Sequence, residues 1–69
     1  MRKSWVSATV TDLRRAKKMS RRLLAERAGV AESTIASIES GRNLPNITTF
    51  EAVLYELGSE LVVRRYGEE

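Results

Sequence analysis

Residues 20–45, SRRLLAERAGVAESTIASIESGRNLP, decide the fold of this 69-residue chain. Ser20 is a favourable N-cap, and apolar side chains follow it at helical spacing until Gly29, a residue type that commonly ends helices. A second helix is predicted over residues 32–40 and ends at Gly41. Because only three residues separate the two helices, they must cross steeply, which predicts a helix-turn-helix.

The flanking segments predict two more helices and a strand. The first helix is expected over residues 7–18 with Ser7 as its N-cap, and the fourth over residues 47–57 with Asn46 as its N-cap. Residues 60–66 are rich in β-forming side chains and predict a short strand. Its partner is expected to be either the segment at residues 4–6 or a second copy of the chain, and a frayed tail is the alternative.

Composition excludes several classes of function. The chain has no His and no Cys, which excludes disulfide frameworks, zinc fingers and catalysis by imidazole or thiol. We expect no metal and no cofactor, and no enzyme activity, because 69 residues leave little room for a cleft. No apolar run is long enough for a membrane helix or a signal peptide, and the lack of Cys fits the reducing cytoplasm.

The net charge of +3 is unevenly distributed. Residues 1–27 carry nine basic and two acidic side chains, whereas residues 28–69 carry three basic and seven acidic ones. Such asymmetry indicates one positive face that attracts a polyanion, although Lys and Arg that merely solvate helix faces would give the same count.

The motif as a whole resembles the Cro and lambda-repressor type of helix-turn-helix domain over residues 8–58. The resemblance rests on Leu13, Arg14, Ser20, Leu24, Ala25, Ala28, Gly29, Val30, Ser33, Thr34, Ile35, Ile38, Glu39, Gly41, Pro45, Phe50, Leu57 and Gly58. It implies an all-α fold of four to five helices, with a DNA-binding domain at residues 1–58 and the helix-turn-helix at residues 20–40. Residues 59–69, the short C-terminal β-strand and tail, are the candidate dimerisation element.

The resemblance also implies a structural ion pair between Arg14 and Glu39. We expect the pair to be partly buried and to fix geometry near the DNA more than to add net stability. Substitution Glu39→Ala is then expected to weaken DNA binding with little loss of helix content.

Candidate base contacts are the outward positions of the second helix of the motif, which are Glu32, Ser33, Ser37 and Thr34. Ser bonds to several base edges, Glu accepts from cytosine N4, and Thr34 is placed to touch a phosphate or a thymine methyl. Short side chains predict few bidentate contacts and leave the operator sequence open. A purely solvated helix face is the alternative.

Candidate phosphate contacts are basic or polar side chains beside that helix. They are Arg21, Arg42 and Asn43, with Arg22 and Lys18 as further candidates, and Arg15 is expected to add long-range attraction. Each of them could equally be ordinary surface. In the family a Gln usually stands where this chain has Arg21.

The resemblance predicts a sequence-specific transcriptional regulator, a repressor that binds a palindromic operator as a homodimer. Dimerisation is assigned to the apolar residues of the tail, Leu61, Val62, Val63 and Tyr66. This ending looks like the HipB-like antitoxins, which would add a toxin protein as a partner. A phage regulator or a restriction-modification controller is also compatible with the motif. Double-stranded DNA is expected as a partner, and a membrane is not.

Overall fold

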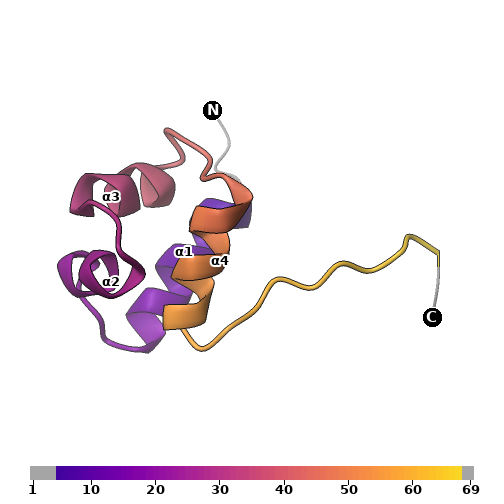
Figure 1. Cartoon of the computed structure of the whole chain (residues 1–69), viewed down its shortest axis with the longest axis horizontal. Coiled ribbons are helices and arrows are strands. Elements are labelled where there is room, and N and C mark those ends of the chain that lie inside the picture. Colours follow the sequence, from indigo (N-terminus) through magenta and orange to yellow (C-terminus); the bar gives the residue numbers. More distant parts are fainter. Residues whose placement is uncertain (1–4, 68–69) are drawn as a thin grey trace.

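The computed structural model describes residues 5–67, which form an all-α fold of four helices (Figure 1). The helices are α1 (Trp5–Ala16), α2 (Arg21–Ala28), α3 (Glu32–Ser40) and α4 (Ile47–Glu56). Helix α3 packs against both α1 and α2, and α2 packs against α4. The C-terminal segment leaves the helical body as an extended chain (Figure 1).

Local capping signals position the helix-turn-helix as predicted. The Ser20 hydroxyl accepts a hydrogen bond from Leu23 N at 3.0 Å, and so caps α2. Gly29 ends α2 with φ 75°, a left-handed conformation that a β-carbon would strain. The Asn46 side chain caps α4 by accepting from Thr49 N at 2.8 Å. The sequence-based boundaries of α2 and α3 and the cap of α4 are therefore confirmed.

The core lies where the four helices meet. It contains Val6, Val10, Met19, Leu24, Ala25, Ile35, Ile38, Phe50, Val53, Leu54 and Leu57. Phe50, Val53 and Leu54 of α4 are buried, as are Leu24 and Ala25 of α2 and Ile35 and Ile38 of α3. Ala28 and Val30 are only partly buried and pack at the edge of this cluster. The core therefore holds α3 at a fixed angle to α2.

Helix α1 differs from its predicted limits at both ends. It begins at Trp5, whose ring meets Phe50 edge-on with centroids 5.8 Å apart. Ser7 is therefore not an N-cap but a buried residue inside α1, and its hydroxyl donates to the backbone carbonyl of Glu39. At the other end the helix stops at Ala16, and Lys18 adopts the left-handed conformation with φ 56°.

The predicted C-terminal strand is not seen among residues 5–67. A strand needs a hydrogen-bonding partner, and Trp5 and Val6 of the expected partner segment belong to α1 instead. Ser4 lies outside the described residues. Leu61 packs against the core, whereas Val62, Val63 and Tyr66 are exposed. No helix within residues 5–67 is long and apolar enough to cross a membrane.

Candidate nucleic-acid interface

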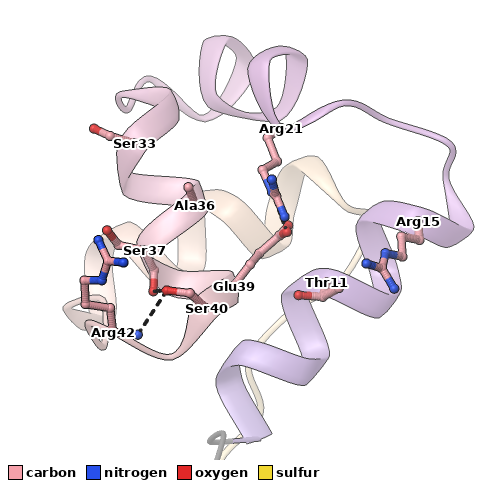
Figure 2. Close-up of a pocket in the computed structure, with 9 residues that line it drawn as sticks. All are labelled: Thr11, Arg15, Arg21, Ser33, Ala36, Ser37, Glu39, Ser40 and Arg42. Carbon is pink, nitrogen blue, oxygen red and sulfur yellow. Dashed lines mark hydrogen bonds and ion pairs between the residues drawn. The ribbon is translucent and has the colours of Figure 1, made fainter.

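The outward stripe of α3 is a ridge of short side chains between two hollows. Ser33, Ala36, Ser37 and Ser40 recur at helical spacing and form the ridge. The first hollow, of about 560 Å³, is lined by Thr11, Arg15, Arg21, Ser33, Ala36, Ser37, Glu39, Ser40 and Arg42 (Figure 2). The second, of about 270 Å³, is lined by Ser33, Thr34, Ser37, Ile38, Asn43, Leu44 and Pro45. Ser33 and Ser37 line both hollows.

The first hollow is positively charged. Three of its lining residues, Arg15, Arg21 and Arg42, are basic, and they come from α1, from the start of α2 and from the segment after α3. Glu39 is the one acidic residue among those that line it. The hollow therefore has the charge expected of a site that faces an anion.

Glu39 binds two arginines at the back of this hollow. Its Oε2 accepts from Arg14 Nε at 2.6 Å, and its Oε1 accepts from Arg21 Nε at 2.8 Å and from Arg14 Nη2 at 3.1 Å. Arg14 Nη1 also donates to the backbone carbonyl of Met19 at 2.8 Å. With the hydrogen bond from Ser7 to the Glu39 carbonyl, residue 39 connects α3 to α1 and α2.

This cluster is almost fully buried at its centre. Glu39 is 3% exposed, Arg14 is 12% exposed and Arg21 is 47% exposed. Burial alone raises the pKa of the Glu39 carboxyl, but the hydrogen bonds and charges of Arg14 and Arg21 outweigh it and hold the pKa below its usual value. The hydrogen bond to Glu39 raises the pKa of Arg14 against the opposing effect of burial. This burial argues against the expectation that Glu39→Ala spares the fold.

Comparison with protein families identifies the motif. A family model described as Helix-turn-helix matches residues 10–62, most of the chain. The chain belongs to the helix-turn-helix family. It is therefore a DNA-binding regulator in general terms, and this family is not typically enzymatic. A comparison with curated proteins gave no match.

In this helix-turn-helix protein α2 and α3 form the motif, and α3 is the recognition helix. Three of the four candidate base contacts line a hollow: Ser33 and Ser37 line both, and Thr34 lines the second. Glu32 lines neither hollow and is exposed as the first residue of α3.

Only some of the candidate phosphate contacts lie beside α3 in the structure. Arg21 and Arg42 line the first hollow and Asn43 lines the second. Arg22 lines neither hollow and forms an exposed ion pair with Glu26 at 3.4 Å. Lys18 lies with Arg27 and Glu56 around a third hollow that contains no residue of α3. The helix-turn-helix thus brings Arg21, Arg42 and Asn43 to the recognition helix and leaves the other two apart.

The sequence did not indicate Thr11 as part of the site, and it assigned Arg15 only a long-range attraction. They are four residues apart on α1, so they share one face of that helix, and both line the first hollow. The buried Thr11 Oγ1 has no hydrogen-bond partner among the described residues. The spacing was visible in the sequence, but the approach of α1 to α3 was not. Within residues 5–67 no group of three acidic residues is placed to hold a metal.

Proposed function

We propose that the protein is a transcriptional repressor that inserts α3 into the major groove of a palindromic operator as a homodimer. The observation that carries this proposal is the ridge of Ser33 and Ser37 between two hollows, with Arg21 and Arg42 on one side and Asn43 on the other. A major groove is about 12 Å wide and is bordered by phosphates on both sides. A ridge flanked by basic and polar side chains matches that shape.

The short side chains of the ridge suit close approach of the helix backbone to the bases. Ser33 and Ser37 each offer a hydroxyl that both donates and accepts. Exposed Glu32 at the start of α3 accepts from cytosine N4, and Thr34 contacts a thymine methyl or a phosphate from the second hollow. These contacts give direct readout of part of each half-site.

Phosphate binding in the first hollow is assigned to Arg15 and Arg42, and in the second to the Asn43 amide. Arg21, predicted as a phosphate contact from the sequence, lines the first hollow beside them with its Nε bound to Glu39. Exposed Arg22 and Lys18 add only long-range attraction. Each neutralised phosphate lowers the log–log slope of affinity against salt by about 0.9. Affinity is therefore expected to fall steeply as salt rises.

Dimerisation is assigned to the C-terminal tail. Val62 is 70% exposed, Val63 is 90% exposed and the Tyr66 side chain is fully open to solvent in the single chain. Two extended tails that pair across a twofold axis would bury these side chains and satisfy the backbone groups of both strands. Leu61 packs on its own core and is expected to orient the tail rather than to cross the interface.

An antitoxin that holds a toxin protein is the second candidate function. The same exposed tail residues, Val62, Val63 and Tyr66, would suit a different protein as well as a second copy. A complex with a toxin would persist at high salt because it buries apolar surface, whereas the complex with DNA would dissociate.

The proposal is tested by selecting bound sequences from a random pool of duplex DNA at two salt concentrations. We expect an enriched palindrome whose half-site centres are about 10 base pairs apart, with much weaker binding at the higher salt. Enrichment of a single unrepeated half-site would contradict the dimer, and no enrichment at either salt would contradict sequence-specific binding.

A further inference from the structure

Arg21 differs from the other basic residues of the first hollow in being held by a buried partner. It is the first residue of α2, and its Nε donates to Glu39 Oε1 at 2.8 Å. Figure 2 shows its side chain extending from α2 toward Glu39 beside the recognition helix. About half of the side chain remains exposed. Arg21 is thus both anchored and open to a ligand.

Glu39, the residue that holds Arg21, is itself fixed in place. Glu39 is 3% exposed, and its carboxylate is bound from the other side by Arg14, which is tied in turn to the Met19 carbonyl. A guanidinium is planar, so a hydrogen bond that holds its Nε edge also fixes the direction of its terminal nitrogens, Nη1 and Nη2. These two nitrogens form a fork, which can donate two parallel hydrogen bonds to one acceptor group.

The ridge leaves room for such a fork. Ser33, Ala36 and Ser37 line the same hollow as Arg21, and none of them extends further than a hydroxyl or a methyl. Two hydrogen bonds to one base edge require a side chain with two polar groups at its end. Among the residues that line this hollow, Glu39 and the arginines have such an end, but both oxygens of Glu39 are already bound to Arg14 and Arg21. Arg21 is the lining arginine whose orientation is fixed by the recognition helix itself.

We propose that Arg21 reads a guanine, with Nη1 and Nη2 donating to guanine O6 and N7 in the major groove. Glu39 and Arg14 are positioning residues that hold the fork in place. This inference rests on the proposed function, in which α3 enters that groove. It assigns sequence readout to a residue outside the recognition helix, at the start of α2.

The first arm of the test repeats the selection from random DNA with Arg21→Lys and, as a matched control, Arg27→Lys. Lysine keeps the charge but lacks the fork, so Arg21→Lys is expected to lose a guanine preference of roughly tenfold at one position of each half-site and to retain the others. Arg27 is exposed on the same helix and lines neither hollow, so its variant is expected to select the wild-type sequence. Circular dichroism checks that both variants fold.

The second arm replaces that guanine with 7-deazaguanine, which lacks the N7 acceptor. Wild-type protein is expected to lose roughly tenfold in affinity, whereas Arg21→Ala, which has no donor at this position, is expected to bind both DNAs equally. Equal losses in the two proteins would overturn the inference. Unchanged selection by Arg21→Lys would also overturn it. So would an Arg21→Ala variant that binds all sequences more weakly to the same extent, with a log–log salt slope smaller in magnitude by about 0.9, because a phosphate contact behaves in this way.

Different results would contradict the proposed function and the role of Arg21. If the wild-type protein enriches no DNA sequence, the proposed function is contradicted and this inference falls with it. If the wild-type protein enriches an operator that lacks the Arg21-dependent guanine, only the inference is contradicted.

Discussion

Arg14 and Glu39 form a buried ion pair, with Arg14 Nε 2.6 Å from Glu39 Oε2, that joins α1 to the last turn of the recognition helix. A second arginine, Arg21, binds the same carboxylate from the start of α2. The three helices that shape the interface therefore share one carboxylate. The pair therefore links α1 directly to α3.

Removal of the carboxylate alone is expected to destabilise the protein. Substitution Glu39→Ala leaves Arg14, 12% exposed, without its charge partner, which typically costs about 3 kcal/mol. The free energy of unfolding from urea titration checks this. Glu51→Ala, a change on the exposed face of α4, is the control and is expected to alter stability by less than about 0.5 kcal/mol.

A double variant separates geometry from stability. The double variant Arg14→Met, Glu39→Gln removes both charges of the pair, and the Gln amide oxygen can still accept from Arg21. Its free energy of unfolding is therefore expected to recover most of the loss seen in Glu39→Ala. DNA affinity is expected to stay reduced because the fixed orientation of α3 and Arg21 is weakened. Full recovery of affinity together with stability would contradict a role of the pair in positioning α3 on DNA.

Acid is expected to weaken the fold through Glu39. Its pKa is lowered in the folded protein by Arg14 and Arg21, so the unfolded chain binds the proton more readily. The stabilisation from this carboxylate is complete above the unfolded pKa of about 4.3 and is lost as the pH falls through the lower folded pKa. Urea midpoints between pH 7 and pH 2.5 should fall less in Glu39→Gln than in the wild type; parallel curves would argue against the assignment.

The turn after α1 contains strain that a glycine would relieve. Lys18 has φ 56°, and a β-carbon in this left-handed region costs roughly 1 kcal/mol. Lys18→Gly is therefore expected to raise the melting temperature slightly. Lys17→Gly is the matched change, and it is expected to lower the melting temperature because Lys17 N still makes a helical hydrogen bond to Leu13 O. If both variants were destabilised equally, backbone strain at Lys18 would be excluded.

Local signals made much of the motif predictable. Ser20, Gly29, Gly41 and Asn46 act within a few residues of their own position, through caps and left-handed turns, so their sequence is enough to place α2, α3 and the start of α4. The Arg14–Glu39 pair was expected only from family resemblance.

Features that depend on contacts between residues far apart in the sequence could not be predicted from local signals. Ser7 looked like an N-cap because its partner, the carbonyl of Glu39, is 32 residues away. The contact of Arg21 with Glu39 spans 18 residues and was not anticipated. The predicted strand at residues 60–66 had the right side chains but no partner strand within residues 5–67.

Truncation of the tail tests the dimer. Deletion of residues 62–69 retains Leu61, which packs on the core, and removes the exposed residues Val62, Val63 and Tyr66. The product is expected to be a folded monomer in sedimentation equilibrium and to bind the operator much more weakly than the full chain, because one half-site alone remains. A dimer that survives the deletion would place the interface on the helical body. Deletion of residues 60–69 is expected to give the same monomer with lower stability.

Base readout by the outward ridge of α3 is tested most directly by an altered-specificity experiment. Ser37→Asn adds an amide that matches the adenine edge, whereas Glu51→Gln changes an exposed side chain on α4. Selection from random DNA with both variants is the measurement. Ser37→Asn is predicted to move the preferred base toward adenine at one position in each half-site, with the half-site spacing and the Glu51→Gln result unchanged. Selection of the wild-type sequence by Ser37→Asn, with wild-type affinity, would contradict the placement of α3 in the major groove.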